Sequence, residues 1–273
     1  MLPMIFSEPI PFDEALNSIE VKSILPAALS SRQLSRVAPA LRERAFFSAR
    51  TTNAWYLQQQ HDLVASLVQP GAKGEYVNPA EVRTRLKESL AALDYQPDPA
   101  RRGGLQDLSS DARLNLIIDT QEKMAHGYGG WAQSQEPAVL DEWPAQELYR
   151  AESRDEERDW ISRWQAAGGN LYGGGRMIAL KNAPIWIEIS AFGLPYPPFD
   201  FNSGMWVTDV DRTEAVDLGL LDANTKIAPE TRGFNDDLSS SSPVDRQSAL
   251  FTSLLQTLGE RVLFRDGVLH WKA

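Results

Sequence analysis

The sequence predicts an α+β protein that is predominantly helical, with a helical N-terminal body and a small mixed α/β C-terminal segment. Two observations lead to this prediction. Apolar residues recur at helical spacing in most segments up to residue 168. After Gly175 the segments become short and rich in β-branched and aromatic residues. We therefore expect a helical body over residues 1–168 and an α+β segment over residues 169–273, without internal repeats.

The N-terminal part begins with two helical patterns. Residues 12–25 carry apolar side chains at near-helical spacing, and Pro26 should end that helix. Residues 31–69 have the pattern of one long helix, or of two helices with a break near Pro39. Pro70 and the glycine after it predict the end of this segment.

The clearest helix signal covers residues 78–93. Asn78 is a good N-cap, Pro79 suits the first helical position, and Glu81 completes a capping box. Val82 begins a series of apolar residues spaced by three or four, which predicts one buried helix face.

Three more helices are expected before residue 168. Ser109 or Ser110 should cap a helix that ends at Gly127. Residues 137–150 predict a shorter helix that starts near Pro144. The third helix is closed by Gly168-Gly169, and its two tryptophans, at positions 160 and 164, lie on one face, which favours a place in the core.

The C-terminal part mixes short elements. "RMIAL" and "PIWIEIS" each fit a short strand or a helical turn, whereas "MWVTDV" predicts a strand. "DRTEAVDLGLL" predicts a capped short helix. Residues 228–245 have no packing signal, "QSALFTSLLQTLGE" predicts an amphipathic helix, and "RVLFRDGVLHW" predicts a hairpin that turns at Asp266-Gly267.

Composition excludes several classes of protein. Apolar residues make up 42% and charged residues 23% of the 273 residues, which is ordinary for a globular protein. The absence of cysteine excludes disulfides and thiolate metal sites. The N-terminus lacks the pattern of a signal peptide, and no run of 18 apolar residues predicts a membrane span. The net charge of −10 opposes nucleic-acid binding by the chain as a whole.

No motif predicts catalysis, a cofactor or a metal. The three histidines are scattered, whereas zinc ligands usually recur at short spacing. "GGNLYGGGRM" lacks the order of a nucleotide-binding loop and follows a helix, which favours a flexible connector. No GxSxG elbow occurs. We therefore expect no catalytic, cofactor-binding or metal-binding residues, and no enzyme activity.

Four stretches, taken in order, resemble the Mu protein F-like family of tailed-phage head morphogenesis proteins, also called minor head or minor capsid proteins. They are "PFDEALNSIEVKSILPA", "ERAFFSARTTNAWYLQQQHDLVASLVQPG", "RLNLIIDTQEKMAHGYGGW" and "ALKNAPIW…PPFDFNSGMWVTDVDRTEAVDLGLL". The resemblance covers about residues 9–221, and residues 222–273 match nothing in it.

This resemblance implies a protein that acts by protein–protein contacts near the portal during head assembly. It implies portal or capsid proteins as partners, the host cytoplasm as the place of assembly, the virion head as a final location for some members, and no cofactor. One departure concerns the proline segment. The family often ends it with a Cys-Arg-Cys-like tip and a nearby histidine, whereas this chain has Ser203-Gly204-Met205. The departure favours a structural role for the tip.

The segment "PYPPFDFNSGM" has two main interpretations, and a catalytic loop is the third and least favoured. Its prolines make the backbone stiff and extended, so its aromatic rings can pack inside the protein as a clamp. Alternatively, Tyr196 and Phe199 anchor a partner. Trp131 and Trp143 flank a predicted loop and a short helix and are further candidate partner contacts.

Two other functions stay open. A hydrolase or transferase could assemble its site from dispersed residues such as Asp119, Glu122 and His126. A virion protein could instead contact DNA weakly through a basic helix face, although such a charge run is more often a solvated surface. Its residues are Arg32, Arg36, Arg42, Arg44 and Arg50.

Overall fold

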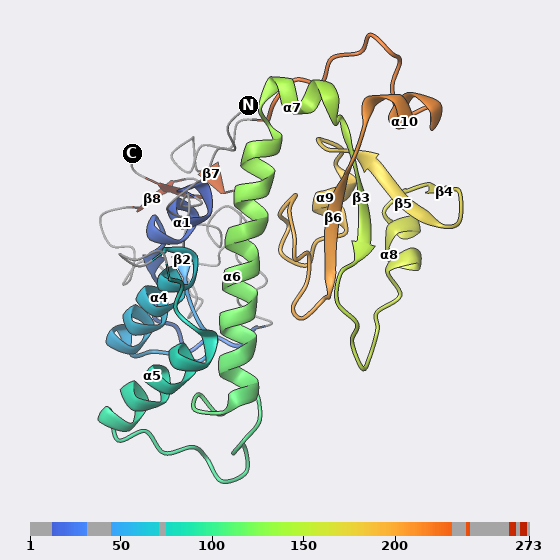
Figure 1. Cartoon of the computed structure of the whole chain (residues 1–273). Helices are drawn as coiled ribbons and strands as arrows, with labels where there is room; N and C mark the ends of the chain where they lie inside the picture. The colour runs from blue at the N-terminus through green and yellow to red at the C-terminus, as the bar shows by residue number, and fades with distance from the viewer. Residues whose placement is uncertain are drawn as a thin grey trace, which may run out of the picture. The chain divides into compact units, whose positions relative to one another are not determined.

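The structure is a computed structural model that describes residues 13–31, 45–70, 75–230, 239–240, 262–265 and 268–271. These residues form a mixed α and β structure, as the sequence predicts (Figure 1). The chain divides into two compact units. Unit 1 comprises Met1–Ala125 and Phe234–Ala273, and unit 2 comprises His126–Gly233. The division therefore falls inside a helix and not at residue 168, where we expected it.

Unit 1 is built on α1, α4, α5 and the first part of α6, with short strands beside them. The bounds are α1 (Asp13–Glu20), β1 (Ser23–Ile24), β2 (Ala45–Phe46), α4 (Ala54–Val68), α5 (Pro79–Ala92), α6 (Asp111–Ser134), β7 (Ser239–Ser240), β8 (Val262–Arg265) and β9 (Val268–Trp271). β1 pairs with β2 in parallel, and β7, β9 and β8 form an antiparallel sheet in that order.

The helix expected over residues 31–69 is wrong for residues 45–53. Residues 45 and 46 form β2, and the backbone N–H of Leu25 donates to the carbonyl of Phe46 at 2.9 Å. Phe46 is fully buried among residues of α1 and α4. An aromatic side chain suits this buried strand as well as a helix face, so tertiary packing overrides the apolar periodicity. The expected break near Pro39 lies outside the described residues.

The predicted starts of α5 and α6 are confirmed. The Asn78 side chain accepts from the backbone N–H of Ala80 at 2.8 Å, and Pro79 is the first helical residue. Ser110 Oγ accepts from the N–H of Arg113 at 3.1 Å at the start of α6. Glu81 does not show the expected capping-box bond, because its carboxylate accepts from Arg85 one turn later at 2.5 Å.

Two apolar clusters form the core of unit 1. One joins α1, β2, α4 and α6, and the other joins α4, α5 and α6. The buried members are Ala15, Ile19, Phe46, Leu57, Val64, Val68 and Ala125 in the first cluster, and Tyr56, Leu67, Val82, Leu86, Leu90, Leu114 and Ile118 in the second. The helical stripe that begins at Val82 is thus the buried face of α5, as predicted.

Unit 2 is a four-stranded antiparallel sheet with short helices. Its strands are β3 (Ala145–Arg150), β4 (Leu171–Tyr172), β5 (Arg176–Leu180) and β6 (Met205–Val210), in the spatial order β4-β5-β3-β6. The helices are residues 126–134 of α6, α7 (Pro137–Glu142), α8 (Trp160–Ala166), α9 (Ile185–Glu188) and α10 (Arg212–Asp217).

The two faces of this sheet carry different helices. Leu148, Met177 and Met205 pack on α8, α9 and the proline segment, in a cluster that contains Trp160, Trp164 and Trp186. Side chains alternate between faces along a strand, so the opposite face carries Ala145, Ile178 and Val210, which pack on Ala215 of α10. The predicted core position of Trp160 and Trp164 is confirmed, since they are 3% and 0% exposed.

Three expectations in this region need correction or resolution. The short helix expected over residues 137–150 is wrong beyond Glu142, because residues 145–150 form the central strand β3. This pairing also explains why the unit boundary lies before residue 168. "RMIAL" is strand β5, whereas "PIWIEIS" contains the helical turn α9. The glycine-rich connector is the turn of the β4–β5 hairpin.

The remaining C-terminal expectations have mixed outcomes. The strand over "MWVTDV" and the helix capped by Asp211 are confirmed as β6 and α10. The two strands of the predicted hairpin are confirmed as β8 and β9, which pair antiparallel. Its turn at Asp266-Gly267 and the helix expected over residues 247–260 lie outside the described residues.

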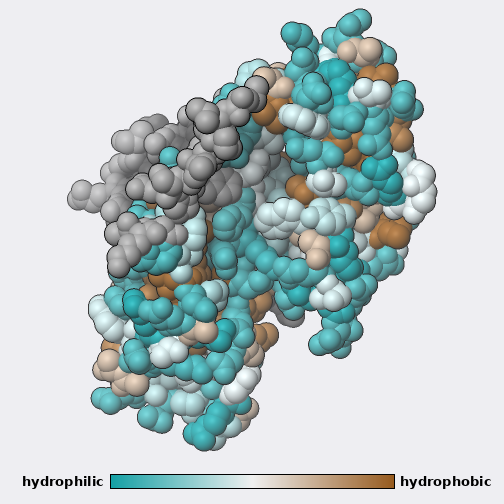
Figure 2. All heavy atoms as spheres, viewed as in Figure 1, coloured by the Kyte–Doolittle hydropathy of each residue, from teal (hydrophilic) through white to brown (hydrophobic). Residues whose placement is uncertain are grey.

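The surface is mainly hydrophilic on the face drawn in Figure 2, where apolar residues form separate small patches. None of the helices that the structure describes has the length and apolar character needed to cross a bilayer.

Candidate functional site

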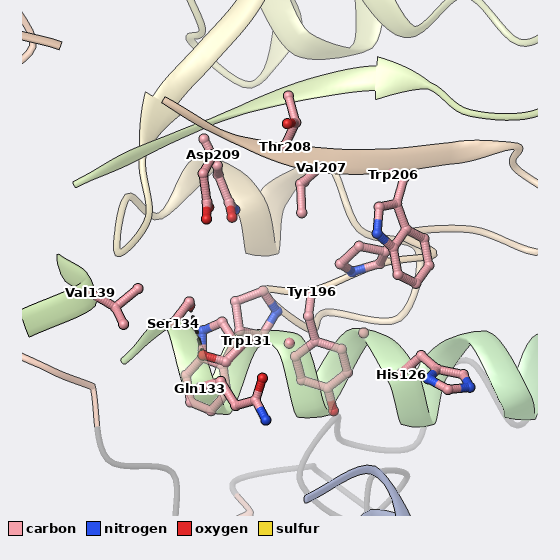
Figure 3. Close-up of a pocket in the computed structure, with 15 residues that line it drawn as sticks. His126, Trp131, Gln133, Ser134, Val139, Tyr196, Trp206, Val207, Thr208 and Asp209 are labelled. Atoms are coloured by element: carbon pink, nitrogen blue, oxygen red, sulfur yellow. Dashed lines mark hydrogen bonds between the residues drawn. The ribbon is translucent and has the colours of Figure 1, made fainter. Parts of the chain in front are cut away.

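Unit 2 contains a pocket of about 460 Å³ between the C-terminal part of α6 and strand β6 (Figure 3). This volume lies within the range of ligand-binding pockets in proteins. The proline segment and the start of β3 complete the wall. The lining residues are His126, Gly127, Gly130, Trp131, Gln133, Ser134, Val139, Gln146, Pro195, Tyr196, Pro197 and Trp206–Asp209.

Glycine lets α6 approach the proline segment closely. A Cβ atom at Gly127 would lie 2.2 Å from the carbonyl oxygen of Pro197, which no real side chain tolerates. The helix end expected at Gly127 is therefore wrong: α6 continues to Ser134. The glycine serves a close contact between two backbones and does not end the helix. At Gly130, three residues later, a Cβ atom would meet open space.

An aromatic cluster forms the floor of the pocket. The ring centroids of Trp131 and Tyr196 lie 6.1 Å apart. The ring centroid of Tyr128 lies 5.9 Å from that of Trp131 and 5.6 Å from that of Tyr196. Trp131 is 7% exposed, and its indole Nε1–H is buried without an acceptor among the described residues. A buried donor without a partner is uncommon in folded proteins.

The proline segment is packed inside unit 2. Residues 194–199 are all buried, and the Pro197–Pro198 bond is cis. The Phe199 ring stacks on Trp186 with centroids 5.9 Å apart. The backbone carbonyl of Phe199 accepts from the N–H of Ala191 at 2.7 Å. This arrangement favours the clamp interpretation over the docking interpretation.

The tip of the segment is a tight backbone corner. Ser203 Oγ donates to the carbonyl of Pro198 at 2.5 Å and accepts from the N–H of Met205 at 3.1 Å. Gly204 has φ +68°, and a Cβ there would lie 2.3 Å from the carbonyl oxygen of Glu152. Both residues therefore have a structural role in this corner of the backbone.

An ion pair with one buried partner lies at one end of β6. Lys181 is 1% exposed, and its Nζ lies 2.8 Å from Oδ1 of Asp209, whose side chain is 52% exposed. The contact is an ion pair whose geometry falls short of a good hydrogen bond. A buried ammonium requires such a counter-charge. Asp209 belongs to the pocket wall, so the wall carries at that end a carboxylate that is paired with Lys181.

The structure separates the four predicted partner contacts. Trp131 and Tyr196 lie together in the pocket wall, and Phe199 is fully buried in the clamp. Only Trp143, at the C-terminal end of α7, is substantially exposed, at 41%. Sequence reasoning missed the exposed ring of Phe201, which is 44% accessible. It also missed Asp209 and Lys181, because no local sequence pattern predicts an ion pair between residues that lie far apart in the chain.

The pocket does not bring together the three dispersed residues considered for catalysis, Asp119, Glu122 and His126. Of the three, the wall contains only His126. Burial lowers the pKa of its imidazole. Asp119 forms an ion pair with Lys123 at 2.9 Å, and burial followed by the nearby Asp119 charge raises the pKa of Glu122. Within the described ranges, no three His, Asp or Glu side chains gather as metal ligands.

Of the predicted basic patch, only Arg50 falls within the described residues. Its side chain is exposed, and Nη1 donates to Oε1 of Gln106 at 2.7 Å. The other four arginines, Arg32, Arg36, Arg42 and Arg44, lie outside.

Comparison with known proteins yields no match to this chain among family models, curated proteins or solved structures.

Proposed function

We propose that this chain is a head morphogenesis protein, or minor capsid protein, of a tailed phage, and that it acts by protein–protein contacts near the portal. The proposal rests on the sequence resemblance over about residues 9–221. It implies assembly in the host cytoplasm and portal or capsid proteins as partners.

The observation that carries the proposal is the construction of the proline segment. This segment belongs to the last of the four resembling stretches, although its tip departs from the family, and here it is a buried clamp whose tip is a backbone corner. Ser203 uses its hydroxyl for two internal hydrogen bonds, and Gly204 leaves no room for a side chain. A segment of this kind holds the fold of unit 2 in place, which supports a structural role for it in the proposed assembly function.

The exposed aromatic rings supply candidate contact points. Trp143 and Phe201 in unit 2 are 41% and 44% exposed, and Trp55 in unit 1 is 49% exposed. Tryptophan in particular is enriched among the residues that contribute most to protein interfaces. We take Trp143 as the first residue to test, because it stands at the end of a helix and its burial would not disturb the core.

The experiment is affinity purification of the tagged chain from phage-producing cells, followed by identification of stoichiometric partners. We expect portal or capsid protein to co-purify, and Trp143→Ala to reduce the recovered partner more than about fivefold. Trp143→Phe, which keeps an aromatic ring, is the matched control. Recovery of the chain only as a free monomer during head assembly would contradict the proposal.

A further inference from the structure

Strand β6 lies at the edge of the sheet in unit 2. It pairs with β3 through all six of its residues, from Met205 to Val210. Among the described residues, no strand pairs with its other side. An edge strand presents unpaired backbone N–H and C=O groups, which can pair with another chain.

The backbone hydrogen bonds identify which groups point away from the sheet. Ala151 N–H donates to the carbonyl of Gly204 at 2.9 Å, so these residues face each other as a hydrogen-bonded pair. Such pairs alternate along antiparallel strands. Residues 206, 208 and 210 therefore direct their backbone groups towards β3, and residues 205, 207 and 209 direct theirs to the free edge.

Two further bonds agree with this assignment. On the far side of β3, Lys181 N–H donates to the carbonyl of Pro144. The backbone groups of β3 that do not bond to β6 therefore point towards β5. On the free edge, the N–H of Met205 donates to Ser203 Oγ. Within the part of the chain that the structure describes, the backbone N–H groups of Val207 and Asp209 have no such partner.

The pocket adjoins strand β6 and also reaches Gln146 of β3. Residues 206–209 form one of its walls, and Trp131 stands in its floor with an unpaired indole N–H (Figure 3). The N–H groups of Val207 and Asp209 are about 7 Å apart, as alternate residues of a strand are. A partner strand presents its carbonyls at this same spacing, whereas a small molecule rarely does.

We propose that the free edge of β6 and the adjoining pocket bind an extended peptide segment of a partner protein, which adds to the sheet as a fifth strand. Peptides bind other sheet edges in this way, with main-chain hydrogen bonds for affinity and pockets for alternate side chains. An apolar side chain of the peptide enters the pocket beside Trp131 and Tyr196. A basic side chain lies next to the half-exposed Asp209, and the net charge of −10 favours such a ligand.

This inference rests on the proposal that the chain works by protein contacts, but it does not depend on the identity of the partner. Its test uses only the purified full chain and the synthetic peptide acetyl-Lys-Val-Lys-Val-Lys-Val-amide. A peptide with proline in place of the central valine is the control. We expect binding of the first peptide to slow amide exchange at Val207 and Asp209 about tenfold when its concentration is ten times Kd.

The chain offers a matched pair of variants at one position. Val207→Pro and Val207→Ala both remove the valine side chain, but only the first removes the outward N–H. Proline is tolerated in an edge strand where the N–H faces away from the sheet. We expect Val207→Pro to bind the peptide about tenfold more weakly than Val207→Ala. A peptide methylated on alternate backbone nitrogens loses the reciprocal bonds, from its own N–H groups to the outward carbonyls of β6, and should bind the unaltered chain with a similar loss. It tests the strand pairing if Val207→Pro does not fold.

Three outcomes would overturn the strand-addition proposal. The first is no binding at millimolar peptide. The second is equal affinity of the two Val207 variants together with full binding of the methylated peptide. The third is a peptide that fills the pocket while the amides of Val207 and Asp209 exchange at their original rates. None of these results depends on whether head proteins co-purify with the chain, so the two proposals fail separately.

Discussion

The two units of this protein differ in how far apart in the sequence their core residues lie. In unit 1, the second core cluster consists of residues from the buried faces of α4, α5 and α6, and in α5 they are Val82, Leu86 and Leu90, spaced by four. In unit 2, the main cluster joins Leu148, Trp164, Trp186 and Phe199, which come from four separate elements. Local periodicity therefore describes unit 1 well, whereas unit 2 depends on contacts between distant segments.

The units also differ in what they bury. Unit 1 buries several polar side chains on α4 and α6, among them Tyr56, Gln60 and Thr120. Arg113 donates from Nη2 to Ser48 Oγ at 2.6 Å and to the carbonyl of Ala49 at 2.7 Å. Unit 2 places four buried tryptophans and a clamp of buried prolines around its sheet, with Lys181 as its one fully buried cation among the described residues. We expect titration to affect unit 1 and packing defects to affect unit 2.

The largest effect should come from Phe199→Ala. Loss of the ring that stacks on Trp186 leaves a cavity, and we expect unit 2 to lose about 4 kcal/mol of stability. Hydrogen exchange resolved by segment measures each unit separately. Phe201→Ala is the control: its ring contacts Phe192 but is 44% exposed, so the loss should stay below about 1 kcal/mol. Equal losses in the two variants would argue against the clamp.

The next effect should come from Gly127→Ala. The added methyl group meets the backbone of Pro197, which cannot move without the whole clamp, and we expect a loss of about 3 kcal/mol. The matched control is Gly130→Ala on the same helix, where the methyl group has open space and should stabilise by up to about 1 kcal/mol. Chemical denaturation compares the two variants. If both were stabilising, the close contact between α6 and the clamp would be disproved.

A pH effect should distinguish unit 1. Burial raises the pKa of Tyr56 to about 12. The unfolded chain loses this proton near pH 10, so the stability contribution is fully present below pH 10 and is lost as the pH rises through about 12. We expect a loss of more than about 1 kcal/mol at pH 11 relative to Tyr56→Phe, measured as unfolding free energy from pH 9 to 12.

The control for this titration is Tyr76→Phe, at a position 49% exposed in the same unit. Parallel stability curves for the unaltered chain and Tyr56→Phe across this pH range would show that the Tyr56 hydroxyl titrates normally. Our distinction between a polar unit 1 and an aromatic unit 2 would then lose its main support.

The smallest effect should come from Asn78→Ala. The side chain caps α5 with one hydrogen bond to Ala80 N–H, and its loss should cost about 1 kcal/mol. Asn78→Asp keeps an acceptor at the cap and adds a favourable charge at the helix N-terminus, so it should be neutral or stabilising. Urea denaturation measures both variants. A loss in Asn78→Asp equal to that in Asn78→Ala would show that the cap contributes nothing to unit 1.

The candidate site was only partly accessible to sequence reasoning. The aromatic and proline content of residues 195–201 indicated a rigid internal clamp, and the buried state of Phe199 supports that interpretation. Trp131 and Tyr196 were selected as single candidate contacts, without any signal that they share one pocket. The free edge of β6 had no signal either, because a strand's position in a sheet depends on which segments pair with it.

The sequence by itself determined the features that depend on neighbouring residues: the cap at Asn78, a serine cap at Ser109 or Ser110, the buried face of α5, the tryptophan face of α8 and the strand character of β6. Only the tertiary structure decided that residues 145–150 are the central strand and that α6 continues past Gly127. It also decided that Lys181 meets Asp209. The physical reason is that caps and helix stripes are satisfied within one or two turns, whereas strand pairing, close backbone contacts and buried charge pairs are stabilised by residues tens of positions away.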